Sequence, residues 1–195
     1  MLLGCPFGGC AILYRRTLSP FVSRVCSLSK RFCTISLRLC DPTSNSIINT
    51  LLINVYLPTN YNTDDSNNAF LESIAELDGF ISAQSFDNLI ICGDFNVDFS
   101  HNNNNCVVLS DPMCTYDLIR AASNSSISYT YRRDDMSAHS WPDHVLLKYF
   151  MHIVKEVACE DSVDNFSDHL PLYLSQLLQH LLITSPMIAV PLKAS

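Results

Sequence analysis

Several features are missing from this sequence of 195 residues, and each absence excludes a class of protein. No stretch reaches the roughly 18–20 consecutive apolar residues of a membrane span, so we expect a soluble protein with no membrane partner. No CxxC pair occurs among the nine cysteines, and their odd number argues against a secreted disulfide framework. We therefore expect reduced thiols and an intracellular protein, in the nucleus or the cytoplasm.

Acidic residues are absent from residues 1–40, which carry six basic side chains and a charge of +6. Because the whole chain carries −7, the remainder carries −13. A basic flank beside an acidic body could hold a polyanion while carboxylates hold a metal ion. The alternative, that these basic side chains are merely solvated at strand edges, is equally consistent with the sequence.

Hydrophobic residues make up 48% of the chain and charged residues 16%, which is typical of a globular domain. We predict one domain over residues 1–178 and a monomer. The tail, residues 179–195, is apolar but broken by Pro186 and Pro191, so we expect it to be unstructured.

The pattern of apolar residues predicts an α+β or mixed α/β sandwich. Period-two alternation over 33–39 and a longer apolar run over 47–57 predict two antiparallel strands joined by a turn. Helical spacing after Asp64-Asp65-Ser66 predicts a helix. Residues 102–105 are expected to form a polar loop, and 107–122 an irregular stretch followed by a helix. Further strands are predicted at 10–14, 89–92, 129–131, 144–150, 153–159 and 170–174.

The first candidate site is Gly93-Asp94-Phe95-Asn96, directly after the apolar strand 89–92. Gly93 lets the backbone turn where a Cβ would crowd, and period two is expected to place Asp94 and Asn96 on one face. A carboxylate and an amide there suit an attacking water or a metal-bound phosphate. The alternative is an Asx-rich turn that only leaves the strand, which is the more common explanation of this motif alone.

Three further motifs lie at strand ends, and each also has a plain structural explanation. Asp168 and His169 precede a strand and offer a metal ligand and a proton donor, or ordinary capping. Asp143, in Trp141-Pro142-Asp143-His144, could fix the tautomer of a histidine elsewhere. Tyr56 ends the strand in NVYLP and could place its hydroxyl at the site or pack in the core.

Together these motifs resemble the endonuclease/exonuclease/phosphatase superfamily, which includes pancreatic deoxyribonuclease and the apurinic endonucleases. Three segments are similar to the endonuclease domain of LINE-type non-LTR retrotransposons: PFGGCAILYRR, INVYLPTN and SYTYRR…WPDHVLL. The resemblance covers roughly residues 4–175. It implies a four-layer α/β sandwich, in which two mostly antiparallel sheets are flanked by helices, and a hydrolase that cuts DNA with Mg²⁺, or Mn²⁺ in its place.

The resemblance also implies roles for individual residues. Asp94 would orient the attacking water, Asn96 and Tyr56 would contact the phosphate, and Asp168 would be a metal-side carboxylate. His169 would stabilise the transition state, oriented by Asp143. The expected DNA contacts are Tyr129, Thr130 and Arg15.

One departure from the family is expected to matter. The family takes an Asn and a metal-ligand Glu from strands that precede the GGCAIL segment, and here no Glu occurs before Glu72. The resemblance therefore implies an N-terminally truncated domain with weak metal binding and little or no activity. Two alternatives stay open: a catalytically dead remnant of a retrotransposon endonuclease, or an inositol-lipid phosphatase or sphingomyelinase of the same fold.

Overall fold

The computed structural model describes residues 9–25, 29–40, 46–59, 61, 63–101, 104–121, 127–133, 135–148, 154–161, 165 and 167–176. The expected tail at 179–195 and the first residues of the PFGGCAIL motif lie outside these ranges. None of the described helices is long and apolar enough to cross a lipid bilayer.

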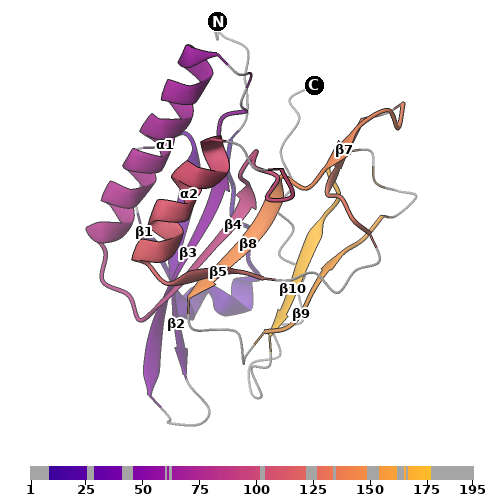
Figure 1. Ribbon diagram of the computed structural model, residues 1–195. Helices are drawn as coiled ribbons and strands as arrows, with labels where there is room; N and C mark the ends of the chain where they lie inside the picture. The colour runs from indigo at the N-terminus through magenta and orange to yellow at the C-terminus, as the bar shows by residue number, and fades with distance from the viewer. Residues whose placement is uncertain are drawn as a thin grey trace, which may run out of the picture.

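A six-stranded sheet forms the centre of the molecule (Figure 1). Among the described strands, β3 and β4 are the one parallel pair, because the helix α1 (Asp64–Ser82) carries the chain from one to the other. The predicted hairpin over 33–57 is confirmed as β2 paired with β3 in antiparallel register. In spatial order the strands are β1 (Val22–Val25), β2 (Phe32–Cys40), β3 (Ile47–Tyr56), β4 (Asn88–Asp94), β8 (Asp143–Lys148) and β5 (Leu118–Arg120).

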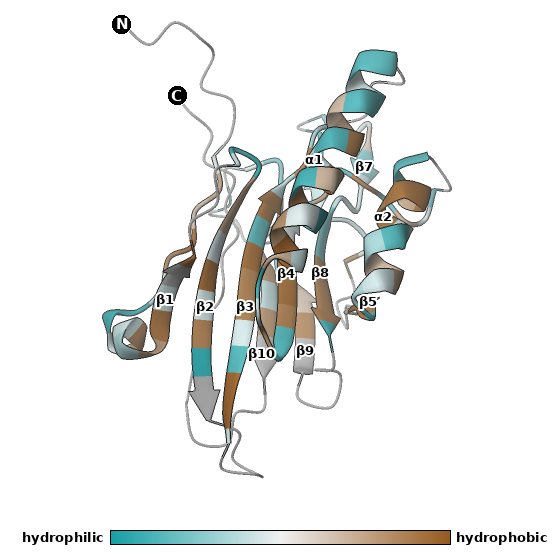
Figure 2. Ribbon diagram, turned by 90° about the vertical axis from the view of Figure 1, so that its left-hand side faces the viewer, coloured by the Kyte–Doolittle hydropathy of each residue, from teal (hydrophilic) through white to brown (hydrophobic). Residues whose placement is uncertain are grey.

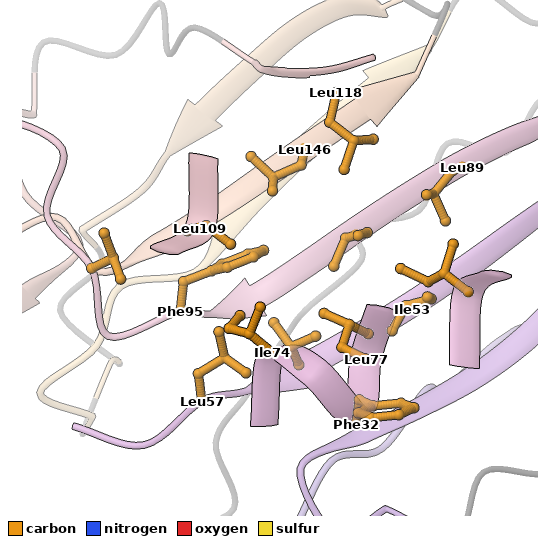
Figure 3. Packing of buried hydrophobic residues seen from close by; sticks show 14 of the residues in the cluster. Phe32, Ile53, Leu57, Ile74, Leu77, Leu89, Phe95, Leu109, Leu118 and Leu146 are labelled. Atoms are coloured by element: carbon orange, nitrogen blue, oxygen red, sulfur yellow. The ribbon is translucent and has the colours of Figure 1, made fainter. Parts of the chain in front are cut away.

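Helices α1 and α2 (Asn104–Thr115) cover one face of this sheet. Helix α1 begins at a capping box in which Thr63 and Ser66 satisfy each other's backbone amides. Its apolar stripe is the one that the sequence predicts and packs against alternate residues of β3, β4 and β8, as Figure 3 shows. The buried residues of the stripe are Phe70, Ile74, Leu77 and Ile81.

A smaller sheet lies over the opposite face. Strands β9 (Val154–Cys159) and β10 (Leu172–Gln176) pair antiparallel, and Leu174 packs against a second apolar cluster of the central sheet. Unbroken brown runs occur along β3 and β4 in Figure 2, because apolar side chains of consecutive residues are buried on opposite faces of the sheet. The prediction of a mixed α/β sandwich is thereby confirmed. The second cluster consists of Ile35, Leu52, Ile90, Val145 and Leu147.

Four local predictions are wrong. The stretch 107–122, expected to be irregular and then helical, is helical up to Thr115 and then extended in β5, because Leu118–Arg120 pair with β8. Residues 10–14 form no strand, because their polar groups contact the face of the sheet and not a strand edge. Cys10 Sγ donates a hydrogen bond to the Arg31 carbonyl, and Asn54 Nδ2 donates one to the Ala11 carbonyl. A 3₁₀ helix, η1 (Arg16–Phe21), follows them. The loop expected at 102–105 gives way to α2, which begins at Asn104. Of the strand 129–131, only Tyr131 is paired, in the short ladder of β6 (Tyr131–Arg132) with β7 (His139–Ser140).

Candidate active site

One row of side chains crosses the central sheet at the carboxyl end of β4. Tyr56 pairs in register with Asp94, and Asp94 pairs with Asp143. Tyr56 N also donates to the Arg31 carbonyl over 2.7 Å, which extends the row to the start of β2. We call Arg31, Tyr56, Asp94 and Asp143 the site row.

The site row faces the β9–β10 side of the sheet, because its members share the strand parity of the second apolar cluster. Directly beneath it lies a row of small or polar residues, and beneath that an aliphatic row. The site row and the aliphatic row of the core therefore occupy successive levels of the same face of the sheet. The middle row is Cys33, Asn54, Cys92 and Val145, and the lower row is Ile35, Leu52, Ile90 and Leu147.

The backbone after β4 holds Asp94 in place. Gly93 has a φ of +127°, and a Cβ there would lie 2.7 Å from Asn54 Oδ1 and collide with the Val55 carbonyl. Asn96 follows in the left-handed region, at φ +50°. Its backbone N and its Nδ2 donate to the two carboxylate oxygens of Asp94, over 2.8 and 3.2 Å. Asn96 thus reaches Asp94 through an Asx turn, the structural explanation of this motif, and not through period two along a strand.

His169 joins the row from the loop before β10. Its Nδ1 lies 2.9 Å from Asp143 Oδ2, and because an ionised carboxylate only accepts, Nδ1 is the donor. The loop is held by His169 N, which donates to Ser167 Oγ, and by Asn165 Nδ2, which donates to the His169 carbonyl. The structure therefore places Asp143 where it can orient the His169 ring.

Burial and like charge act together on the acidic residues of the site. Burial, and then the charge of Asp143, raise the pKa of Asp94 to about 7. Burial alone would lower the pKa of His169, but its hydrogen bond to Asp143 and the nearby carboxylates outweigh that effect and raise it. The pKa of Tyr56 is raised by burial and by Asp94. The site thus disfavours extra negative charge and would gain from a cation.

Ligand atoms of Asp94, Asp143 and His169 lie within 4.8 Å of one another. Both carboxylates are more than nine-tenths buried, and two crowded carboxylates offer the hard oxygens that divalent cations such as Mg²⁺ take in proteins. These residues therefore fit a divalent cation. Asp168 is outside this group, although its charge raises the pKa of both Tyr56 and His169.

The residues expected to contact DNA do not join the site row. Thr130 is fully buried, and its hydroxyl accepts a hydrogen bond from Asp143 N over 3.2 Å. Thr130 has no exposed surface with which to contact DNA, so that expectation is corrected: its hydroxyl instead holds the backbone of Asp143. Tyr129 is half-buried, with its ring centroid 5.7 Å from that of His139. Arg15 is exposed at the N-cap of η1.

Sequence reasoning missed Arg31, Asn165 and Asp98. Asp98 Oδ2 accepts from Trp141 N and so fixes the segment that leads into Asp143. Asn165 lies two residues before the Ser167-Asp168-His169 motif, so its amide could have been predicted to stabilise the loop through side-chain hydrogen bonds. Nothing in the local pattern distinguishes Arg31 from the other basic residues of the first 40, because its position depends on the pairing of β2 with β3.

No family model matches the sequence, and no curated protein matches it. Solved structures match its fold. The endonuclease domain of TRAS1, a telomere-specific non-LTR retrotransposon, superposes with a TM-score of 0.62 at 14% identity, covering 86% of this chain and 72% of that one. A 3′-5′ exonuclease from Neisseria meningitidis gives 0.57 at 15%, covering 85% and 68%. An endonuclease/exonuclease/phosphatase family protein from Leptotrichia buccalis gives 0.52 at 14%, covering 80% and 59%.

The chain has the endonuclease/exonuclease/phosphatase fold. It spans 59–72% of the length of these three neighbours. Within this fold, the site row lies at the sheet edge where β4 ends, and the small β9–β10 sheet brings the His169 loop across to it. A buried carboxylate pair, a hydrogen-bonded imidazole and a phenol converge there, which is a set suited to proton transfer and to binding an anion with a cation.

Proposed function

We propose that this chain is a metal-dependent phosphodiester hydrolase of the DNA endonuclease type, of retrotransposon origin. The observation that carries the proposal is the convergence of Asp94, Asp143 and His169, with the His169 imidazole hydrogen-bonded to Asp143. Nuclease names among the structural neighbours, including a retrotransposon endonuclease domain, support nucleic acid as the substrate class.

The residues of the chain would divide the work between proton handling and phosphate binding. Asp94, whose carboxylate is fixed by two hydrogen bonds from Asn96, would orient the attacking water. His169, with Nδ1 directed to Asp143, leaves Nε2 for a phosphoryl oxygen, and its raised pKa keeps a positive charge where negative charge develops. Tyr56 lies beside Asp94 and would contact the phosphate. Asn96 would do so only by giving up one of its bonds, because its Nδ2 donates to Asp94 and to the Leu57 carbonyl.

The proposed cofactor is Mg²⁺, with Mn²⁺ as a substitute. The carboxylates of Asp94 and Asp143 would hold it, with Asp168 at the margin of the group. When bound, the cation would neutralise charge on the phosphate. With two carboxylates in the group, we expect weak binding that needs millimolar metal.

A second candidate is a nucleic-acid-binding remnant of the same fold without catalysis. It is favoured by the composition of the metal group, which contains no glutamate among the described residues. A phosphatase of inositol lipids or a sphingomyelinase is a further alternative within the fold. Each of these functions predicts a different response to a small set of substrates.

A substrate comparison separates the candidates. The purified chain is incubated with supercoiled plasmid, an inositol-lipid phosphate or sphingomyelin, each with 5–10 mM Mg²⁺ or Mn²⁺, about the concentration that weakly held Mg²⁺ requires. We expect slow nicking of the plasmid that EDTA stops, and no release of phosphate or phosphocholine from the lipids. Plasmid binding without nicking would favour the remnant, and lipid turnover would favour the phosphatase or sphingomyelinase.

A further inference from the structure

A pair of thiols lies beneath the site row at the start of β2. Cys33 belongs to the middle row, where it pairs in register with Asn54. Cys10 comes from the segment before η1, and its Sγ donates to the Arg31 carbonyl over 3.3 Å. Asn54 Nδ2 donates to the Ala11 carbonyl over 3.2 Å. These contacts hold the segment against the face of the sheet that carries the Cys33 side chain.

A hydrogen bond joins the two thiols. This bond from Cys10, and a second from Asn54, outweigh burial and lower the pKa of Cys33. The same bond, followed by burial, raises the pKa of Cys10, although the charge of Arg31 acts in the opposite direction. Cys33 is therefore the member of the pair that ionises first. A thiolate stabilised by nearby donors and a cation is the reactive form of cysteine.

The other described cysteines are placed differently. Cys92 also belongs to the middle row, but it lies two strands away from Cys33, and its Sγ donates to a backbone carbonyl over 3.6 Å. Cys106 and Cys159 are buried, whereas Cys10 and Cys33 are both half-buried. A small oxidant can therefore reach the pair, and each thiol has a partner beside it.

We propose that Cys10 and Cys33 are a modification site, which an oxidant of the peroxide class converts into a reversible disulfide. The Cys33 thiolate attacks one peroxide oxygen and breaks the O–O bond, which leaves a sulfenic acid on Cys33 and a hydroxide that takes up a proton. Cys10 Sγ then attacks the Cys33 sulfur, and the S–OH oxygen leaves as water with the proton of Cys10. Two thiols are oxidised and one peroxide is reduced to two waters. This chemistry is independent of the proposed function.

The disulfide would alter both the segment and the site row above it. Cys10 would lose the S–H that donates to the Arg31 carbonyl, the group that also accepts from Tyr56 N. The bond would also close a loop of chain between residues 10 and 33, which removes conformational entropy from the unfolded state. The oxidised protein should therefore melt about 5–10 °C above the reduced protein.

Peptide mapping of the full chain after oxidation tests the proposal. The reduced protein is treated with hydrogen peroxide in native buffer, the remaining thiols are blocked with N-ethylmaleimide, and the trypsin fragments are analysed without reduction. Cys10 lies in fragment 1–15 and Cys33 in fragment 32–38. We expect these fragments to be joined, with the rise in melting temperature described above, and dithiothreitol to reverse both changes.

Matched variants assign the bond, because fragment 1–15 also contains Cys5. Cys10→Ser and Cys33→Ser, each first shown to fold by circular dichroism, should lose the cross-link and the rise in melting temperature. Cys114→Ser, which removes an exposed thiol of α2, should change neither. A cross-link that persists in Cys10→Ser, or that forms as fast in urea as in native buffer, would overturn the proposal. Oxidation of Cys114 in the parent without joining of the two fragments would overturn it as well.

Discussion

At the scale of single residues, the hydrogen bond from His169 Nδ1 to Asp143 Oδ2 joins two side chains that lie 26 positions apart in the sequence. The bond fixes the tautomer of the ring and favours its protonated form, because a carboxylate accepts from Nδ1–H and attracts the positive charge. Asp143 is in turn fixed by Thr130 and by its own place in β8. The role proposed for His169 therefore depends on a residue that need not touch the substrate.

Replacing Asp143 with asparagine tests this dependence. The amide keeps the shape but loses the charge and can present a donor to Nδ1, so the ring is left in the wrong tautomer. We expect cleavage to slow by about 10²–10⁴-fold and the pKa of His169 to fall, as followed by NMR titration of its ring protons. Asp78→Asn, which alters the carboxylate bonded to Tyr116 on the helix side, should change neither quantity. A normal rate in Asp143→Asn would remove Asp143 from the mechanism.

The raised pKa of Asp94 predicts a pH dependence of metal binding. A proton and a cation compete for this carboxylate, so Mn²⁺ affinity measured by calorimetry should rise about tenfold per pH unit from pH 5.5 towards 7 and level off above it. In Asp94→Asn the remaining affinity should be weaker and nearly independent of pH over this range. Equal pH profiles for the parent and the variant would place the cation elsewhere.

His144 predicts a pH dependence of stability on the helix side of the sheet. It is buried with Nε2 2.7 Å from the Val97 carbonyl, and burial lowers its pKa to about 4. In the unfolded chain the pKa of His144 is near 6.5. The unfolded state therefore takes up the proton first on acidification, and the folded state loses stability as pH falls from 6.5 towards 4. The full loss is about 3 kcal/mol. Urea unfolding at pH 7 and pH 4.5 should show a drop that is smaller in His144→Gln, and equal drops would contradict this assignment.

At the scale of an element, the end of β4 carries the site because its backbone bends where no side chain fits. Gly93→Ala would place a Cβ against Asn54 Oδ1 and the Val55 carbonyl at a positive φ, so we expect a loss of several kcal/mol and a lower urea midpoint. Gly79→Ala is the control: Gly79 is exposed in α1 with nothing within 4 Å of the added Cβ. It should stabilise the chain by about 1 kcal/mol. A Gly93→Ala protein as stable as the parent would mean that the neighbouring backbone moves away from the added Cβ without loss of stability.

Elements with a clear period could be predicted from the sequence, and those defined by partners could not. The alternation over 33–39 and the stripe Phe70-Ile74-Leu77-Ile81 each describe one buried face, which is why β2 and α1 lie where they were expected. The apolar residues 10–14 carry the same local signal, yet they contact the face of the sheet. Thr130 looked like a surface residue of its motif and is buried under Asp143. Local pattern gives a segment its type, but which neighbour satisfies its polar groups is decided by the whole fold.

At the scale of the whole molecule, parallel rows across one sheet turn four separate motifs into one site. Tyr56, Asp94 and Asp143 come from three strands whose register aligns them, and His169 arrives from the smaller sheet opposite. The motifs could be found in the sequence, since each is polar and lies at a strand end. The register of the strands could not be predicted from the sequence. Arg31 was missed for the same reason, since it belongs to the row only because β2 pairs with β3.

The central claim, that this row is a metal-dependent phosphodiesterase site, is tested most directly by nicking of supercoiled plasmid in Mg²⁺ by the parent chain beside Asp94→Asn. Both proteins are first shown to have the same circular dichroism and melting behaviour. The account predicts slow conversion to open circles by the parent, none in EDTA, and a rate at least about 10²-fold lower in Asp94→Asn. Equal rates for the two proteins, or no Mg²⁺-dependent nicking by a folded parent chain, would contradict it.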